Sequence, residues 1–365
     1  MKWIRHLRIL LLITLAGPVA AAERAPLFQD DTIMKAVLTA PIMQAYAQRD
    51  QDVRIYYPGQ WTYTDSEGET QRLDVSIRTR GNFRRMYCAL PPLQLNFKKS
   101  QVKGTEFKGQ DKLKLVAPCS AGPAAQQNVL MEYMAYRIFE ILTDRSFGTR
   151  LMRLSYIDSD GKRASWTDFV FVIEDDGDMG KRLKLDPLRV AYNEFDQLDQ
   201  STTALVELFQ LMIGNNDYSI LKGPEGDFCC HNIEMFADEN AVGKRITIPF
   251  DFDMSGLVYA DYAAPPSHLP IKSVRTRFYR GLCQPTEVLD DAVAHILSKR
   301  GEITALFERT EELSRLSRKR TSSYLEKYFD LLEDEEKLAK EIVGRCRGMD
   351  HLEELMAEDR PTALN

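Results

Sequence analysis

Short β-rich runs separated by glycine and proline fill residues 51–120, and this pattern constrains the fold more than any other feature of the sequence. The runs are VRIYY, QWTYT, RLDVSIRTRG, PLQLNFKK and KLKLVAP. Turn-forming residues interrupt them at Pro58-Gly59, Gly68, Gly81, Pro91-Pro92 and Gly104. Because β-branched and aromatic residues favour strands while Gly and Pro favour turns, this region is predicted to form several strands of a sheet.

Hydrophobic periodicity predicts the other elements of the first half. Residues 23–50 are predicted to be helical, because apolar residues recur at helical spacing at Ile33, Val37, Leu38, Ile42 and Ala45. A long helix is predicted over residues 126–142 (QQNVLMEYMAYRIFEIL). Two further strands are predicted over residues 149–158 and 165–175, joined by a hairpin loop at Asp158–Gly161.

The second half has a different pattern. The run STTALVELFQLMIGNNDYS predicts an apolar helix that breaks at Gly214 into a polar loop. The runs HNIEMFAD and KRITIPFDFD predict a β-hairpin around Glu239 and Asn240. After Pro266 the chain is charged and predicted to be mostly helical to about residue 350.

These elements predict an α+β protein of two lobes with a cleft between them. The predicted divisions are a signal peptide (1–22), a β-rich lobe with one main helix (23–175), a mainly helical lobe that contains the hairpin (176–350) and a flexible tail (351–365).

The first residues are typical of a secretory signal peptide. Lys2, Arg5 and Arg8 precede a short apolar run, and small residues allow cleavage before Glu23. An uncleaved anchor is the alternative, but the run is shorter than a spanning helix needs. The protein is therefore expected to be exported, periplasmic or secreted, with no membrane span in its mature form. The net charge of -6 gives no support for nucleic-acid binding.

Six cysteines in an exported chain indicate disulfides. Cys88 with Cys119 is the first expected pair, because both flank short strands of one region. Cys229 or Cys230 with Cys283 is a second possibility. Zinc is the competing interpretation, but the spacing fits no zinc-ligand pattern.

An ordered set of polar residues in the second half suggests phosphoryl transfer. Asp217 lies in the loop after the apolar helix, Asn232 at the start of one hairpin strand, and Asp251 and Asp253 at the end of the other. Phosphoryl transfer needs a carboxylate for the acceptor hydroxyl, and an Asn and an Asp to hold Mg²⁺ on the nucleotide phosphates. The alternative is that the two aspartates simply form a turn.

The first half offers partners for the phosphates. Protein kinases grip them with a strand Lys paired to a helix Glu, and Lys114 and Glu132 are candidates for such a pair. The turn in RTRGNFRR, which contains Arg80, could add contacts to phosphate. Glu174 is a candidate for a hinge position near a nucleotide base, although a solvated acidic loop is the simpler interpretation there.

The segments RTRGNFRR, NVLMEYMAYRIFEIL, GNND, HN and IPFDFDMSG together resemble the CotH family of spore-coat kinases, over roughly residues 75–256. The resemblance implies a divergent protein-kinase-like fold. It implies a catalytic role for Asp217, with Asn232, Asp251 and Asp253 as candidate metal ligands and ATP and Mg²⁺ or Mn²⁺ as cofactors. It also implies transfer of the γ-phosphoryl to a protein hydroxyl or a small acceptor.

Two positions depart from the family pattern. Phe250 stands where the family has Trp, and Leu90-Pro91-Pro92 stands where the family has a pair of lysines. Lys98, Lys112, Lys114 or Arg80 could substitute. Without a substitute the chain would be a catalytically silent binding or assembly module of the cell envelope, and this is the alternative function.

Overall fold

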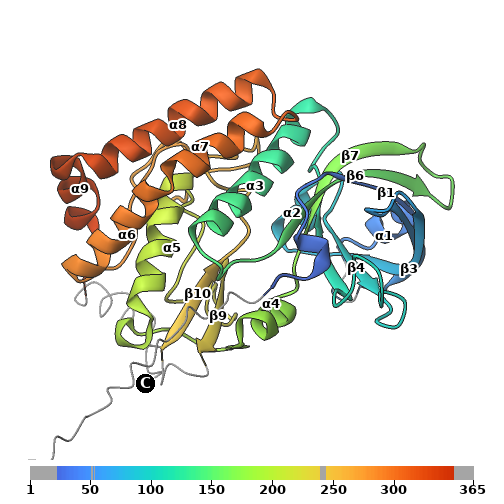
Figure 1. Cartoon of the computed structure of the whole chain (residues 1–365), viewed down its shortest axis with the longest axis horizontal. Helices are drawn as coiled ribbons and strands as arrows, with labels where there is room; N and C mark the ends of the chain where they lie inside the picture. The colour runs from blue at the N-terminus through green and yellow to red at the C-terminus, as the bar shows by residue number, and fades with distance from the viewer. Residues whose placement is uncertain (1–22, 51, 53, 239–243, 349–365) are drawn as a thin grey trace, which may run out of the picture.

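Seven strands of the first half close into a barrel, seen at the right of Figure 1 in the computed structural model of the chain. The structure describes residues 23–50, 52, 54–238 and 244–348. The predicted signal peptide (1–22) and tail (351–365), and the predicted hairpin turn at Glu239 and Asn240, lie outside the described residues.

The barrel strands are β1 (Met34–Ala40), β2 (Tyr57–Thr64), β3 (Thr70–Thr79), β4 (Leu93–Phe97), β5 (Lys112–Val116), β6 (Thr149–Asp158) and β7 (Trp166–Ile173). They follow one another in the order β1-β2-β3-β4-β5-β7-β6, and β6 returns to β1. The pairing of β1 with β6 is parallel and every other pairing is antiparallel.

The closed barrel shows that the predicted two-lobed, protein-kinase-like fold is wrong. The error begins in residues 23–50, which were expected to be helical. Helical structure is limited to a 3₁₀ turn at Pro26–Phe28 and the short helix α1 (Ile42–Tyr46), whereas residues 34–40 form β1 and pair with both β2 and β6. Met34, Ala36, Leu38 and Ala40 are buried in alternation, so the period-two pattern of a strand prevailed over the apparent helical spacing. This strand is the one that closes the barrel.

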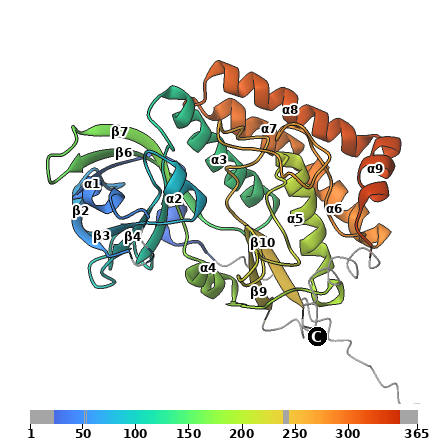
Figure 2. The ribbon, with the colours of Figure 1, turned by 180° about the vertical axis from the view of Figure 1, so that it is seen from behind.

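Alternation along the strands gives the barrel two apolar surfaces. Met152, Leu154, Val170 and Val172 belong to the cluster that fills the barrel, together with Trp61. Their sequence neighbours Leu151, Phe171 and Ile173 belong instead to the larger cluster around the helices. The outer face of β6 and β7 is thus covered by α3 (Pro123–Leu142), as Figures 1 and 2 show.

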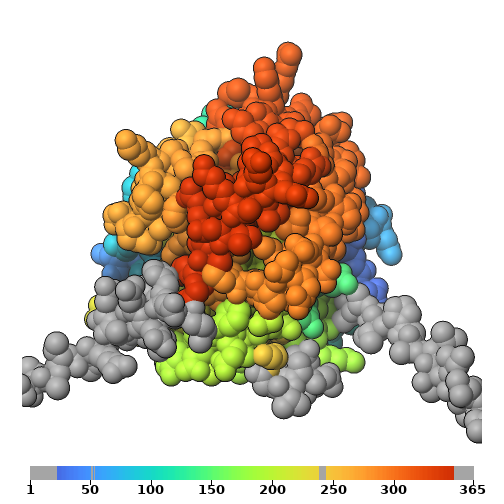
Figure 3. All heavy atoms as spheres, turned by 90° about the vertical axis from the view of Figure 1, so that its left-hand side faces the viewer, coloured from blue at the N-terminus to red at the C-terminus, as the bar shows by residue number. Residues whose placement is uncertain are grey.

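The helices that begin after residue 199 lie on the other side of α3 from the barrel. They are α5 (Gln200–Ile213), α6 (Thr286–Ser298), α7 (Arg300–Arg309), α8 (Arg315–Glu333) and α9 (Glu335–Glu341). Figure 3 views the end of the molecule where the last of these helices gather. A three-stranded antiparallel sheet, β10-β9-β8, accompanies them, with β8 (Leu185–Pro187), β9 (Ile233–Asp238) and β10 (Arg245–Pro249). Two short helices are α2 (Phe83–Tyr87) and α4 (Asp176–Leu183).

Several local predictions are confirmed. The long helix appears as α3, the strands of residues 149–158 and 165–175 as β6 and β7, the apolar helix as α5, and the hairpin strands as β9 paired with β10. Among the residues described, no helix combines the length and the apolar character needed to cross a membrane.

Candidate functional site

The loop that follows α5 holds Asp217 in a tightly fixed backbone. Gly214 ends α5 with a φ of 63°, and a Cβ added there would lie 2.0 Å from the hydroxyl of Tyr324. The chain therefore requires glycine at this turn. The backbone N–H of Asp217 donates to the side-chain oxygen of Asn215 at 3.0 Å. Arg280 donates to the carbonyls on either side of Asp217, those of Asn216 and Tyr218.

His231 and Asn232 meet the Asp217 side chain. The Nε2 atom of His231 lies 2.9 Å from Oδ1 of Asp217. The Asn232 amide donates to the Asp217 carbonyl at 2.7 Å and to its Oδ2 at 3.1 Å. The hydrogen bond to Asp217 raises the pKa of His231. The Asp217 side chain nevertheless remains 38% exposed, so it is accessible from solvent.

Asp251 and Asp253 follow the end of β10, on a segment that is hydrogen-bonded to Asn232. The N–H of Phe250 donates to the Asn232 carbonyl at 3.1 Å, which joins the two segments. The N–H of Asp251 donates to the Tyr136 hydroxyl of α3 at 2.9 Å, and Asp251 has a φ of 60°. Between the two aspartates, Phe252 is buried against Tyr136. The Asp251 side chain is therefore positioned by its backbone.

The Asp251 carboxylate and the Arg80 guanidinium form no hydrogen bond or ion pair within the described part of the chain. Both groups nevertheless interact electrostatically with neighbouring charges. Burial lowers the pKa of Arg80, and the Asp251 carboxylate is the strongest opposing influence. Asp251 also acts on the pKa of His231 and of Asp253. The Asp251 carboxylate and the Arg80 guanidinium thus interact electrostatically without forming an ion pair.

A buried network lies beside them. Arg84, on α2, contacts Oε2 of Glu132 at 3.0 Å and donates to the Ala117 carbonyl at 2.6 Å. Its Nε lies 3.8 Å from Oδ2 of Asp253, which also accepts a hydrogen bond from Tyr262 at 3.0 Å. Burial raises the pKa of Glu132 and of Asp253, and the Asp251 carboxylate adds to both shifts. Four carboxylates, of Glu132, Asp217, Asp251 and Asp253, therefore share a region with Arg80 and Arg84, and with Arg280 and His231 beside Asp217.

Two oxygen donors in this region are candidate ligands for a cation. The Asn232 amide nitrogen is engaged by Asp217, whereas its Oδ1 accepts no hydrogen bond from the residues described. Asn232 Oδ1 and the Asp251 carboxylate are hard oxygen donors of the kind that Mg²⁺ prefers. No group of three or more His, Cys, Asp or Glu side chains in the described ranges is arranged to hold a metal ion. Any metal here would need further ligands from water or from a phosphate.

The expected pair of Lys114 with Glu132 is not formed. Lys114 contacts Asp176 at 3.0 Å and lies over the rings of Phe147 and Phe250. Arg84 takes the Glu132 carboxylate instead. The arginines of RTRGNFRR do not reveal Arg84 as this partner in the sequence. The polar face of a short amphipathic helix is ordinarily exposed, whereas here Arg84 is buried and Phe83 and Tyr87 are exposed.

The Glu174 side chain is also committed within the protein. Its carboxylate accepts from the N–H of Gly148 at 2.9 Å and from Arg182 at 2.8 and 3.0 Å. It is buried, so it has no capacity left for a nucleotide base. Glu174 lies between the end of β7 and the start of α4.

Three disulfides are present. The predicted pair Cys88–Cys119 is confirmed, and it ties the end of α2 to the segment after β5. The predicted pair of Cys229 or Cys230 with Cys283 is wrong, because Cys283 pairs with Cys346 and the two neighbours pair with each other. This pattern is compatible with an oxidising compartment.

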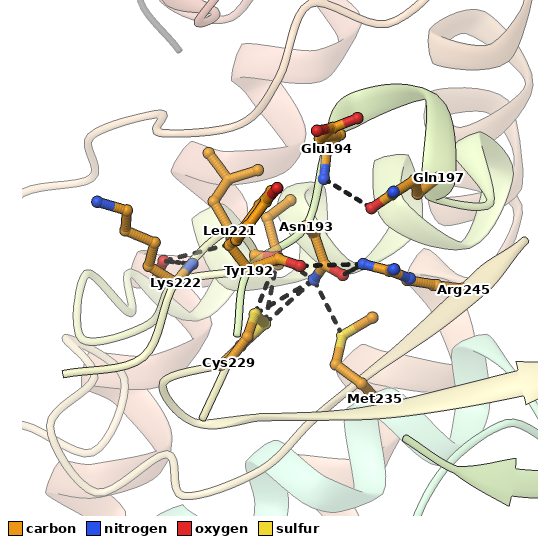
Figure 4. The surroundings of a disulfide bond; sticks show 12 residues. Tyr192, Asn193, Glu194, Gln197, Leu221, Lys222, Cys229, Met235 and Arg245 are labelled. Carbon is orange, nitrogen blue, oxygen red and sulfur yellow. Dashed lines mark hydrogen bonds between the residues drawn. A yellow bond between two sulfur atoms is a disulfide. The ribbon is translucent and has the colours of Figure 1, made fainter. Parts of the chain in front are cut away.

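Figure 4 shows the surroundings of the Cys229–Cys230 disulfide. The Asn193 amide lies 3.2 Å from both sulfur atoms and donates to the Ile220 carbonyl at 2.6 Å, while Arg245 donates to its oxygen. The Asn193 side chain thus joins the loop directly before His231 to the loop that carries Asp217 and Ile220.

The chain was also compared with known proteins. No protein-family model matches it, and no curated protein matches it.

Proposed function

We propose that this protein is an exported, ATP-dependent phosphotransferase that works with Mg²⁺ or Mn²⁺, as the CotH-like motifs suggest. The observation that carries the proposal is the Asp251 carboxylate, which follows a backbone hydrogen bond to Asn232 and acts electrostatically on both His231, the partner of Asp217, and the Arg80 guanidinium. Asp217 is the carboxylate that accepts or orients the acceptor hydroxyl. Asn232 and Asp251 hold the metal, and Arg80 binds phosphate oxygens. The bound metal supplies charge neutralisation on the phosphates.

The neighbouring residues support these roles. The two hydrogen bonds from His231 and Asn232 orient the Asp217 carboxylate while leaving it accessible. Asp253 was expected to be a metal ligand, but its Oδ2 is engaged by Tyr262 and lies close to Arg84. We therefore propose that Asp253 balances the positive charge of Arg84 and does not bind the metal. The acceptor is a protein hydroxyl or a small molecule, and export places the protein in the periplasm or outside the cell.

Nucleotide binding tests the metal site. We expect the melting temperature of the purified protein to rise with ATP and Mn²⁺ or Mg²⁺, because a ligand that binds only the folded state stabilises it. Asp251→Asn should lose the metal-dependent part of the rise, and Arg80→Gln should weaken the response to ATP. The matched control is Asp186→Asn, an exposed carboxylate on β8. Wild-type protein that shows no response to any nucleotide would overturn the proposal, and an undiminished response in Asp251→Asn would overturn the role of Asp251.

Catalysis is tested separately from binding. We expect Asp217→Asn to lower release of ADP from ATP by about 10²–10⁴-fold, the usual contribution of a positioned acid–base group. Its thermal response to ATP and Mn²⁺ should be retained, because Asp217 is not a proposed metal ligand. Equal ADP release by the variant and the wild type would contradict the assignment.

A silent binding module of the envelope is the second candidate. It is favoured by one observation, that Lys114 pairs with Asp176 and leaves Glu132 to a buried arginine. Wild-type protein that binds ATP without measurable ADP release, with Asp217→Asn unchanged in binding, would support this second function.

A further inference from the structure

A cluster of exposed aromatic side chains borders the site. Phe83 is 47% exposed and Tyr87 is 58% exposed, and their rings are stacked with centroids 5.1 Å apart. Tyr262 joins them, with its ring centroid 5.9 Å from Phe83 and 5.7 Å from Tyr87. Met86 beside them is 52% exposed. We call these four residues the aromatic patch.

The helix α2 explains why the patch faces outward. Phe83, Met86 and Tyr87 have the spacing that puts residues on one face of a helix. Arg84 points the other way, into the buried network with Glu132. The Cys88–Cys119 disulfide fixes the end of this short helix. In Figure 2, α2 lies at the junction of the barrel and the helices. The backbone that carries the patch is therefore fixed in position. Exposed apolar surface of this kind marks interaction sites.

Arginines accompany the patch. Burial lowers the pKa of Arg54, and the nearby Arg85 and Arg78 add to the shift, whereas Asp52 opposes it. Arg85 belongs to α2 itself and donates to the carbonyls of Gly81 and Arg49. Within the described residues, Nε and Nη1 of Arg54 and Nε of Arg78 are buried without a hydrogen-bond partner. Positive charge thus gathers around Arg85, on the helix that carries the exposed rings of Phe83 and Tyr87.

We propose that the aromatic patch and the three arginines form a docking surface for an acidic polypeptide segment that carries an aromatic anchor. Aromatic residues, Met and Arg are the types enriched in the cores of protein interfaces, and this surface consists of them. Carboxylates of the partner are attracted by the positive charge of the three guanidinium groups, and its aromatic side chain packs on Phe83 and Tyr87.

A polypeptide suits this surface better than a membrane does. A lipid surface is recognised by charges that adapt to mobile headgroups. Here Arg85 is fixed by two carbonyls, and Arg78 lies over the Tyr56 ring at 4.7 Å from its centroid. Fixed guanidinium groups lose little freedom on binding fixed carboxylates.

The surface is connected to the candidate site through Tyr262, which donates to Asp253 while its ring packs on the patch. An occupant of the patch would therefore lie beside the carboxylates of the site. The docking proposal does not depend on phosphoryl transfer, because a silent binding module could use the same surface.

Three synthetic polymers test the proposal by fluorescence anisotropy with the purified protein: a random copolymer of Glu and Tyr, poly-Glu, and a random copolymer of Lys and Tyr. We expect the Glu–Tyr copolymer to bind at least tenfold more tightly than either of the others. The double variant Phe83→Ala, Tyr87→Ala and the variant Arg78→Gln should each weaken that binding at least tenfold.

Matched controls separate this surface from general stickiness. Ile157→Ala removes another exposed apolar side chain, and Arg189→Gln another exposed arginine, and neither should change binding. Equal affinity for poly-Glu would reduce the surface to non-specific charge attraction and overturn the proposal. Tighter binding to vesicles of anionic phospholipid, lost in the Phe83, Tyr87 variant, would overturn it in favour of a membrane surface. A loss of polymer binding with intact ATP response, or the reverse, distinguishes this surface from the nucleotide site.

Discussion

At the scale of single residues, Asp253 shows the electrostatic tension in this region. It is buried, it lies near Asp251, and Arg84 at 3.8 Å offsets its charge only in part. Burial, with the Asp251 carboxylate, raises the pKa of Asp253 to about 6 from its ordinary 3.8. The folded protein therefore holds a proton on this group more tightly than the unfolded chain does. With respect to Asp253, stability is greatest below pH 3.8 and is lost as the pH rises toward 6.

We expect Asp253→Asn to remove this dependence. The free energy of unfolding of the variant, relative to wild type, should increase by about 1–3 kcal/mol between pH 4 and pH 7, since one pKa unit corresponds to about 1.4 kcal/mol. Urea unfolding at several pH values measures it, with Asp186→Asn as the control. Wild-type and variant profiles that stay parallel over this range would contradict the shift.

At the scale of elements, α2 shows how a short helix can carry important side chains. Five residues are too few for a helix that is stable alone. The Cys88–Cys119 disulfide and the contacts of Arg84 with Glu132 and Ala117 hold it against the barrel and α3. The same helix presents Phe83 and Tyr87 to solvent, so the disulfide supports both the buried network and the aromatic patch.

Removing this disulfide should loosen α2 selectively. We expect Cys88→Ser with Cys119→Ser to lower the free energy of unfolding by about 2–4 kcal/mol. Hydrogen exchange of the backbone amides in residues 83–88 should accelerate at least tenfold. The control is Cys283→Ser with Cys346→Ser, which should destabilise the protein comparably but leave exchange in residues 83–88 nearly unchanged, because that disulfide lies at the Leu282–Arg347 bridge. Equal acceleration in both variants would show that the effect is global.

At the scale of the whole molecule, α3 joins the barrel to the helices. It contacts β6 and β7 on one side and α7 on the other, and twelve of its residues are buried. It also supplies Glu132 and Tyr136, which contact Arg84 of the barrel side and Asp251 of the helical side. The site is therefore assembled only when both parts are folded around α3.

We expect the protein to unfold in one transition. Trp61 and Trp166 lie on barrel strands and are the only tryptophans beyond residue 22, so their fluorescence reports the barrel, whereas circular dichroism at the helix band reports mainly the helices. The two urea unfolding curves should coincide. Ile138→Ala, a substitution of a buried residue of α3, should lower the free energy of unfolding obtained from both curves by about 2–5 kcal/mol. Curves that separate in the wild type would show that the two parts unfold independently.

Much of the local structure was determined by the sequence alone. The strands β3 to β7, the helix α3 and the hairpin strands β9 and β10 follow from hydrophobic period and turn residues, which act between near neighbours. The turn predicted at Pro58-Gly59 is wrong, because both residues lie inside β2 and pair with β3. The order Asp217, Asn232, Asp251 was also sufficient to predict residues that the structure brings together, because short loops connect the elements that carry them.

Only the tertiary structure decided how these elements combine. The strand β1 closes the barrel by pairing with β6, more than a hundred residues away, and no local pattern specifies such a partner. Glu132 pairs with Arg84 across 48 residues rather than with Lys114, and Cys283 pairs with Cys346 across 63. Spacing in the sequence limits which side chains can be neighbours within one element. Contacts between elements depend on which apolar faces are buried together, and the whole chain decides this at once.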